Sequence, residues 1–207
     1  MDNAAVCALL EMAPNLFAAD GGGAASARAA GHWPQAVIGD MDSLDAPLRR
    51  DLEAAGVALM PVAEQDSTDF EKCLQRLRAP LILCLGFTGG RLDHELAALH
   101  ALAAFPAQPA ILVGARDVIF RVPPALELDL AAGTRVSLFP MGPARGASSG
   151  LKWPIDGIDF APGVRIGTSN CALGPVSLRI ARGEMLVILP RRCLPEAARG
   201  LRAAHGG

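Results

Sequence analysis

Three acidic segments lie in the first third of the chain, and each follows a short apolar run. They are residues 19–22 (Ala-Asp-Gly-Gly), 39–43 (Gly-Asp-Met-Asp-Ser) and 65–69 (Gln-Asp-Ser-Thr-Asp). In an open α/β sheet, ligands bind just beyond the carboxyl ends of the strands. Carboxylates gathered there repel one another unless a cation lies between them, and Mg²⁺ takes hard oxygen ligands and also reaches substrate phosphates. The segments therefore predict metal-assisted chemistry on a phosphate compound.

Each acidic pair also has a simpler interpretation. Asp40 and Asp42 are two residues apart, so in an extended segment both side chains point to the same side and can bind one cation. An Asp-rich turn before a helix explains the same pair. Asp69 falls in the first turn of a helix that starts after Thr68, where it either binds metal or complements the helix dipole. Lys72 either binds phosphate or forms an ordinary salt bridge three residues after Asp69.

The segment from residue 86 to 94 (Gly-Phe-Thr-Gly-Gly-Arg-Leu-Asp-His) is a second candidate for phosphate binding. Glycines let the backbone approach a ligand, and amides at the start of a helix favour anions. Arg91 adds a fork of donors suited to phosphate oxygens. A plain strand-to-helix turn with Asp93 as N-cap is the alternative. The chain contains neither the P-loop pattern GxxxxGK[ST] nor GxGxxG with a downstream ribose acid.

In the C-terminal part, Trp153 and the pair Ser169 and Asn170 are the polar and aromatic candidates. An exposed indole ring can stack on a flat heterocycle. Core filling is the usual role of Trp in a β-sandwich, and the residues alone favour that interpretation.

The elements that position these residues alternate between strand and helix up to about residue 120, which indicates a mainly parallel, doubly wound sheet. Thr68 and Glu71 have the spacing of a capping box at the start of one helix. The predicted strands are residues 16–19, 36–38, 57–62, 81–85, 111–114 and 118–122, and the predicted helices are residues 4–12, 24–30, 48–55, 68–77 and 93–104.

After Pro123 and Pro124 the pattern changes to short β-type runs separated by Gly and Pro, which predicts packed antiparallel sheets. The fold class is therefore α/β plus all-β. A doubly wound, mainly parallel α/β domain over residues 1–122 precedes a small β-sandwich over residues 125–192 and a tail over residues 193–207. The β-type runs are residues 126–130, 135–139, 158–160, 164–168, 176–180 and 185–189.

Composition limits the class of protein. The chain has 207 residues, is 51% hydrophobic and has a formal net charge of −2, which suits a folded domain with a real core and no basic stripe for nucleic acid. The five cysteines are widely spaced without a metal-binding pattern, so we expect reduced thiols and a cytoplasmic protein. No apolar run approaches the 18 residues of a membrane span, and no signal peptide is recognised.

Taken in order, the motifs resemble those of the thiamin pyrophosphokinase (thiamin diphosphokinase) family. Four lie in the N-terminal part: residues 19–22, 39–44, 66–72 and 89–94. Two lie in the C-terminal part: residues 150–153 (Gly-Leu-Lys-Trp) and 167–170 (Gly-Thr-Ser-Asn). Each motif alone has low specificity, but six in order are specific, and the resemblance spans about residues 16 to 190.

The resemblance implies an α/β catalytic domain followed by a β-sandwich, in a homodimer that holds thiamin between the α/β domain of one subunit and the sandwich of the other. It implies transfer of a whole pyrophosphate group from ATP to the thiamin hydroxyl, which gives thiamin diphosphate and AMP with Mg²⁺ as the cofactor. No nucleic acid or membrane partner is implied.

Carried over position by position, the resemblance implies four groups of site residues. The metal ligands are Asp20, Asp40, Asp42 and Asp69. The catalytic residues are Asp40, Asp42, Asp69 and Arg91. The ATP-binding residues are Gly21, Gly22, Lys72, Thr88, Gly89, Gly90, Arg91 and Asp93. The thiamin-binding residues are Gln65, Trp153, Ser169 and Asn170.

Two departures from the family pattern accompany the resemblance. The family usually opens with a strand and a glycine-bearing loop, whereas the predicted helix here begins almost at Met1. Ala98 also stands where the family often has Asn. Three alternative functions remain: a pyrophosphokinase for another hydroxymethyl heterocycle such as a pterin, a non-catalytic nucleotide- or thiamin-binding regulator, and a structural or interaction protein.

Overall fold

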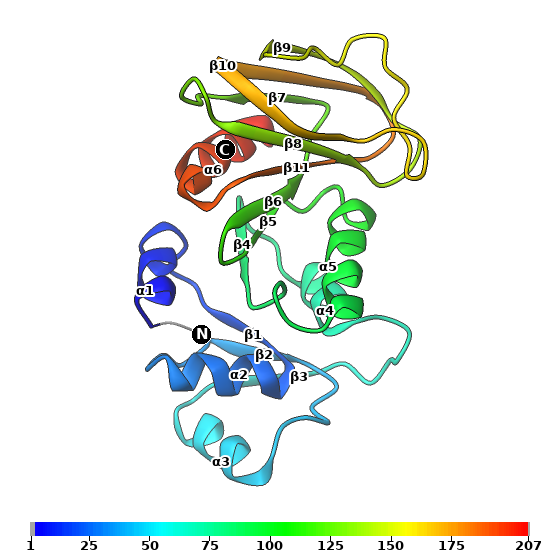
Figure 1. Ribbon diagram of the computed structural model, residues 1–207. Helices are drawn as coiled ribbons and strands as arrows, with labels where there is room; N and C mark the ends of the chain where they lie inside the picture. The colour runs from blue at the N-terminus through cyan, green and yellow to red at the C-terminus, as the bar shows by residue number, and fades with distance from the viewer. Residues whose placement is uncertain (1–2, 207) are drawn as a thin grey trace. The chain divides into compact units, whose positions relative to one another are not determined.

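The computed structural model describes residues 3–206 and divides into two compact units (Figure 1). The first unit ends at Arg78, and the second begins at Ala79. None of the helices among the described residues is long and apolar enough to cross a membrane.

The first unit is a three-stranded parallel sheet with helices between its strands. The strands lie in the order β1-β2-β3, with Ala18 paired to Val37 and Ile38 to Met60. Each strand is followed by a helix, so the three carboxyl ends share one edge of the sheet. The elements are α1 (Asn3–Met12), β1 (Phe17–Ala19), α2 (Asp20–Ala29), β2 (Ala36–Gly39), α3 (Ala46–Ala54), β3 (Ala58–Pro61) and α4 (Asp69–Arg76).

Helix α4 begins with the predicted capping box, which the structure confirms. The Thr68 side chain accepts a hydrogen bond from the Glu71 amide, and the Glu71 carboxylate accepts one from the Thr68 amide. The apolar stripe of the helix is buried, and so is Lys72, a residue type that is almost never fully buried unless it is paired.

The second unit is built on an eight-stranded sheet. Its strands follow the order β4-β5-β6-β11-β8-β10-β7, with β9 paired to β10. The pair β4 and β5 is parallel, and the other pairs are antiparallel. The elements are β4 (Ile82–Leu85), α5 (Leu92–Ala104), β5 (Ala110–Val113), β6 (Asp117–Arg121), β7 (Ala125–Leu128), β8 (Arg135–Pro140), β9 (Arg145–Leu151), β10 (Gly167–Arg182), β11 (Met185–Pro190), a 3₁₀ turn (Arg191–Cys193) and α6 (Leu194–Ala204).

The long strand β10 gives this unit its layered β structure. Its first residues pair with β8, and the remainder pairs with β7 and β9 after register shifts. The predicted fold class is confirmed: a parallel α/β part is followed by a β-rich part. The parallel strands, however, lie in two sheets rather than one, because β5 pairs with β6 and so joins β4 and β5 to the antiparallel strands.

Several predicted elements differ from the structure for identifiable reasons. Helix α2 begins at Asp20 rather than at residue 24, so the three glycines, which are poor helix formers, lie inside the helix. Strand β9 was missed because its small and polar residues carry no clear apolar alternation. Strand β10 was predicted as two runs because Gly174 and Pro175 resemble a break. Residues 158–160 contribute only an isolated bridge between Phe160 and Ala144.

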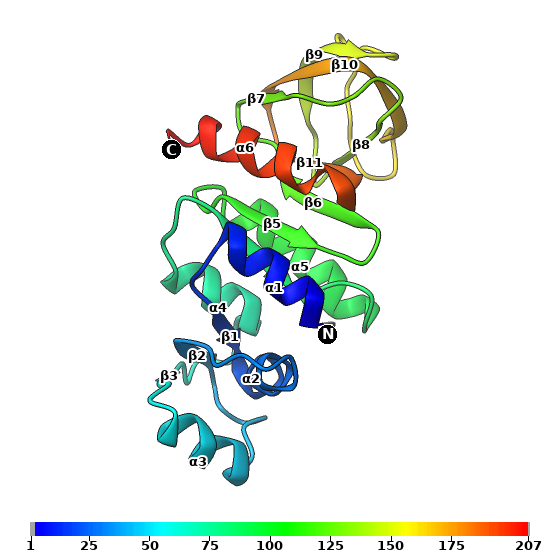
Figure 2. The ribbon, with the colours of Figure 1, turned by 90° about the vertical axis from the view of Figure 1, so that its left-hand side faces the viewer.

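The predicted C-terminal tail contains helix α6, which packs against β7 (Figure 2). Ala197, Ala198 and Leu201 are buried on its inner face. The helix approaches the strand closely at Gly200, where an added Cβ atom would lie 2.5 Å from the Glu127 carbonyl oxygen. Small side chains on α6 therefore set its distance from β7.

We predict that Gly200→Ala destabilises the protein, although Ala is the better helix former by about 1 kcal/mol. The added methyl group must displace backbone, which costs about 1–3 kcal/mol in a packed contact. The reverse substitution at an exposed position of the same helix, Ala203→Gly, measures helix propensity alone. Chemical denaturation of both variants tests the packing, and a stabilised Gly200→Ala variant would contradict it.

Candidate functional site

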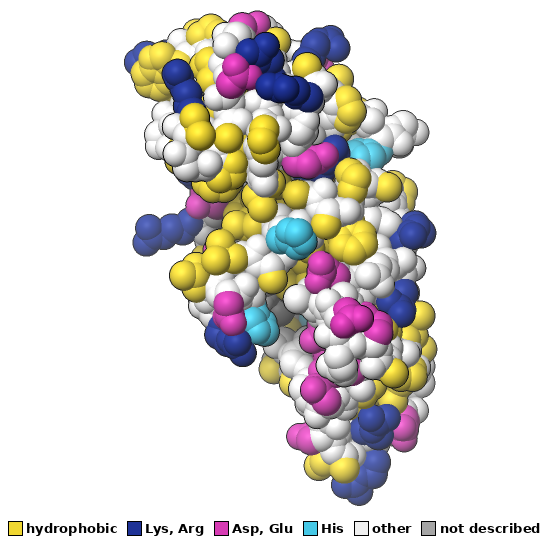
Figure 3. Space-filling view, turned by 90° about the vertical axis from the view of Figure 1, so that its right-hand side faces the viewer, with side chains coloured by type: hydrophobic (Ala, Val, Ile, Leu, Met, Phe, Trp, Pro, Cys, Tyr) yellow, Lys and Arg dark blue, Asp and Glu magenta, His cyan; other side chains and the backbone are white. Residues whose placement is uncertain are grey.

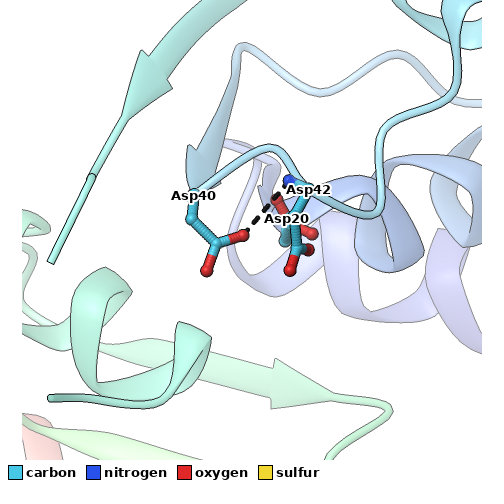
Figure 4. A group of neighbouring side chains, drawn as sticks. All are labelled: Asp20, Asp40 and Asp42. Atoms are coloured by element: carbon cyan, nitrogen blue, oxygen red, sulfur yellow. Dashed lines mark hydrogen bonds between the residues drawn. The ribbon is translucent and has the colours of Figure 1, made fainter. Parts of the chain in front are cut away.

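Three carboxylates meet at the carboxyl edge of the first unit's sheet. Asp20 follows β1, Asp40 follows β2, and Asp42 lies in the turn beyond it; each offers an oxygen within 4.8 Å of the others (Figure 4). Asp20 is buried, whereas Asp42 is exposed. The backbone is not extended as the sequence argument assumed, because Met41 has a φ of +66°. A tight turn, rather than strand alternation, brings Asp40 and Asp42 together.

Asp20 holds this turn in place. Its Oδ1 accepts a hydrogen bond from the Met41 amide at 2.9 Å, and its Oδ2 accepts one from the Ser43 hydroxyl. Asp20 itself has a φ of +50°, an uncommon conformation for a residue other than Gly. An added Cβ atom on Gly39 would lie 2.7 Å from the Asp20 carboxylate, so only glycine fits at position 39.

Asp40 is the most heavily bonded member of the cluster. Its Oδ2 accepts hydrogen bonds from Lys72 Nζ at 2.9 Å and from Gln65 Nε2 at 3.3 Å, and its Oδ1 accepts one from the Asp42 amide at 3.2 Å. The Lys72 hydrogen bond, followed by the Asp42 amide, lowers the pKa of Asp40 to about 2. The neighbouring Asp40 carboxylate raises the pKa of Asp42, first through a hydrogen bond between the two carboxyl groups and then through its charge.

Asp69 lies outside this group of three carboxylates and is connected to Asp40 through Lys72. Lys72 Nζ lies 3.4 Å from Asp69 Oδ1, so the predicted salt bridge is present, and the lysine side chain is only 2% exposed. Burial, followed by the charge of Asp20, raises the pKa of Asp69. Burial alone would lower the pKa of Lys72, but the contacts with Asp40 and Asp69 outweigh it and raise that pKa. The lysine is therefore a charged group enclosed by its two carboxylate partners.

The glycine-rich segment belongs to the second unit and follows β4. The Gly89 amide, in a residue with a φ of +80°, donates to the Glu95 carboxylate at 3.1 Å. Arg91 makes a two-point contact with Asp93, at 3.2 Å and 2.6 Å, and both side chains are mostly exposed. Asp93 is not the N-cap of α5, as the alternative interpretation had it, because the helix begins at Leu92 and Arg91 is the cap.

Two other predicted residues of this segment are accessible to a ligand in different degrees. Gly90 is exposed, with no atom within 4 Å of where a Cβ would be. The Thr88 hydroxyl lies near Gly114, since a Cβ on that glycine would be 3.0 Å from the hydroxyl oxygen. In the first unit, Gly22 is similarly open, whereas Gly21 is buried and would place a Cβ 2.5 Å from the Ser43 carbonyl oxygen.

Trp153 lies after β9 with 54% of its surface exposed, so the core-filling interpretation is wrong. Asn170 clamps its backbone. The Asn170 Oδ1 accepts from the Trp153 amide at 3.2 Å and the Cys171 amide at 2.8 Å, and the Nδ2 donates to the Trp153 carbonyl at 2.6 Å. The side-chain amide of the buried Asn170 is thus hydrogen-bonded entirely to backbone groups. Ser169, with a φ of +61°, donates its amide to the Ser137 hydroxyl at 3.0 Å.

Three contributing residues were not identified from the sequence. Ser43 was inside a recognised motif, but its bond to Asp20 depends on the turn. Glu95 reaches back to the glycine-rich segment from α5. Lys152 places its Nζ 4.7 Å from the centre of the Trp153 ring, and its position next to that residue was the available signal.

The surface gives no sign of a basic stripe on the face that Figure 3 draws. Lys and Arg side chains are scattered there among acidic and apolar ones. This distribution agrees with the net charge of −2 of the whole chain.

Comparison with known proteins identifies the family. The profile described as "Thiamin pyrophosphokinase, catalytic domain" matches residues 6–113, and the profile described as "Thiamin pyrophosphokinase, vitamin B1 binding domain" matches residues 121–183. The chain therefore belongs to the thiamin pyrophosphokinase family.

Individual relatives agree with this result. The chain is 30% identical over 154 residues to thiamine pyrophosphokinase 1 of Oryza sativa subsp. japonica, a match that covers 66% of this chain and 58% of the rice protein. The chain thus spans less than two thirds of that curated relative.

Solved structures have the same fold. Thiamin pyrophosphokinase from Geobacillus thermodenitrificans is similar with a TM-score of 0.70 and 25% identity, over 83% of this chain and 84% of that one. Thiamin pyrophosphokinase from Candida albicans has a TM-score of 0.71 at 16% identity, over 85% and 81% of the two chains.

The bonds of Asp20 predict that it supports the fold of the turn more than Asp42 does. Asp20→Ala removes the acceptors for Met41 and Ser43 and should cost about 1–3 kcal/mol, since relief of repulsion offsets part of the loss. Asp42→Ala, a matched change at an exposed carboxylate, should leave stability unchanged or slightly higher. Urea denaturation without divalent ions measures both, and equal losses would contradict the distinction.

The bonds of Asn170 predict a positioning role for Trp153. Asn170→Ala should cost about 2–3 kcal/mol, because buried backbone groups lose their partners. In a Trp33→Phe background, the remaining Trp153 emission should also lose anisotropy as its backbone is released. Ser149→Ala, on an exposed part of β9, is the control. Unchanged anisotropy together with unchanged stability would refute the clamp.

Proposed function

We propose that this protein transfers the pyrophosphate group of ATP as a whole to the hydroxyl of thiamin, giving thiamin diphosphate and AMP. The observation that carries the proposal is the set of carboxylates at one strand edge, in a chain that matches both domains of the thiamin pyrophosphokinase family. A pyrophosphokinase for another hydroxymethyl heterocycle is less favoured, because the second match is to a vitamin B1 binding domain.

The carboxylates suit a divalent cation by the chemistry of their donors. Asp20, Asp40 and Asp42 offer hard oxygen atoms within 4.8 Å of one another, and Asp69 is linked to Asp40 through Lys72. Mg²⁺ would be held chiefly by this group of three, and Asp69, which lies outside it, would be a further ligand. A bound Mg²⁺ would screen phosphate charge and help align the attacking hydroxyl.

The phosphate groups of ATP would meet the exposed part of the glycine-rich segment. Arg91 is mostly exposed, so exchange of Asp93 for a phosphate would cost little desolvation. Its two-point contact with Asp93 has the geometry that guanidinium also uses for phosphate. Gly90, Gly89 and Thr88 would allow close approach of the triphosphate, as would the open Gly22 in the first unit. Arg91 would then neutralise charge that grows during transfer.

Thiamin would stack on Trp153. Lys152 Nζ lies over one face of the exposed ring, so a flat heterocycle would stack on the opposite face, where a cationic ring gains further attraction from the indole. Asn170 would position Trp153 through its backbone, and Ser169 would hold the adjacent residue of β10 in place. Gln65, whose amide group donates to Asp40, would orient the thiamin hydroxyl near the acidic cluster.

A homodimer with shared sites and a cytoplasmic location remain predictions.

The reaction is tested by incubating the protein with ATP, Mg²⁺ and thiamin and measuring AMP and thiamin diphosphate by chromatography. We expect the two products in equal amounts. Asp42→Asn should lower kcat by about 10²-fold or more, as loss of a transition-state contact does, with little change in melting temperature. Asp129→Asn, an exposed change in the second unit, should have wild-type kcat.

Other outcomes would separate the alternatives. Activity with a pterin alcohol but not with thiamin would assign a different substrate. Nucleotide or thiamin binding without turnover would indicate a regulator. Neither binding nor turnover would leave an interaction protein and contradict the proposal.

A further inference from the structure

Lys72 is a charged side chain where an apolar one would be expected. It lies on α4 beside the buried Phe70, Cys73 and Leu74, and its side chain is only 2% exposed. A buried ammonium group is unfavourable unless charged or hydrogen-bonding partners surround it. The reason for a lysine at this position must therefore lie in its partners.

Those partners come from two separate elements. Lys72 Nζ lies 2.9 Å from Asp40 Oδ2 and 3.4 Å from Asp69 Oδ1. Asp40 follows β2, whereas Asp69 opens α4, and the amide of Lys72 is itself bonded to the Thr68 carbonyl in the first turn. The ammonium group thus ties the end of a strand to the start of a helix at the point where both contribute carboxylates.

The same contacts argue against phosphate binding by Lys72. A side chain that binds ATP phosphates needs donors that a ligand can reach, as the mostly exposed Arg91 has. Lys72 Nζ is enclosed and already engaged by two carboxylates. Its removal from them would leave Asp40 with only Gln65 and the Asp42 amide as donors.

We propose that Lys72 is a positioning residue: a built-in counter-ion that holds Asp40 and Asp69 in place before a divalent cation binds. The proposal rests on the proposed function only for the role of these carboxylates as metal ligands. Like charges within a few ångströms repel, and Asp20, Asp40 and Asp42 already offer oxygens within 4.8 Å of one another. Lys72 offsets part of this repulsion while the cation is absent.

The test is thermal unfolding of the full chain without nucleotide or thiamin. Lys72→Met keeps the unbranched apolar stem of the side chain and removes its ammonium group. Without divalent ions its melting temperature should fall on the order of 10 °C, because the Asp40 carboxylate, only 14% exposed, loses its cationic partner. Saturating Mg²⁺ should raise the melting temperature of the variant more than that of wild type, so the difference between the two melting temperatures should become smaller.

Matched variants make the result specific. Arg49→Met removes a positive charge on α3 of the same unit and should change neither the melting temperature nor its response to Mg²⁺. NaCl at the same ionic strength should not reproduce the Mg²⁺ effect. Asp40→Asn combined with Lys72→Met should lose less stability than the sum of the single changes, since the pair is then removed together. If Lys72→Met does not fold, the melting temperatures of Lys72→Arg and of this double variant, with and without Mg²⁺, are compared with those of wild type instead.

Each alternative has a distinct outcome. Unchanged stability with a tenfold rise in the KM for ATP would make Lys72 a phosphate contact and overturn the proposal. A large loss of stability that Mg²⁺ does not narrow, although Mg²⁺ stabilises the wild type, would make it an ordinary buried ion pair and also overturn it. If Mg²⁺ has no effect on the melting temperature of the wild type, the proposed metal site is wrong. If, in addition, the stability losses of Asp40→Asn and Lys72→Met are additive in the double variant, Lys72 is not a counter-ion of Asp40 and the proposal is overturned.

Discussion

Carboxylates at the strand ends of the first unit repel one another, and the local structure is arranged to offset that repulsion. Each oxygen of Asp20 accepts one hydrogen bond, from a backbone amide and from a hydroxyl group. Asp40 accepts hydrogen bonds from a buried lysine, the Gln65 amide group and a backbone amide. Asp42 receives the least compensation and is the most exposed. Within the cluster, Asp20 thus supports the fold and Asp42 is open to solvent, which is a suitable arrangement for a cation that approaches from solvent.

Backbone strain is concentrated at the same place. Asp20 and Met41 both have positive φ values, which side-chain-bearing residues adopt at a cost. Their hydrogen bond to each other stabilises both conformations at once. Gly39 and Gly21 let the turn after β2 and the start of α2 approach closely. A Cβ on Gly39 would overlap Asp20, and a Cβ on Gly21 would overlap the Ser43 backbone. The turn that carries Asp40 and Asp42 is therefore fixed by its surroundings before any ligand binds.

The second unit separates contact from support in a similar way. Trp153 presents its ring to solvent, while the buried Asn170 uses its whole amide group on the backbone around that ring. Lys152 lies over the same ring, so the chain itself places a positive charge against the indole. Polar residues that belong to a family motif can thus act through the backbone of a neighbour rather than on a ligand.

The sequence alone determined the alternation of strands and helices, the capping box at Thr68, the β-rich C-terminal part and the residue types of the acidic cluster, because local spacing and composition carry these features. Tertiary structure decided the rest. β4 and β5 joined the antiparallel strands because sheet order depends on long-range pairing, and α6 depended on packing against β7. Lys72 could be either a phosphate ligand or an ion-pair partner in the sequence. Its burial between Asp40 and Asp69 depends on how β2 and α4 meet in space.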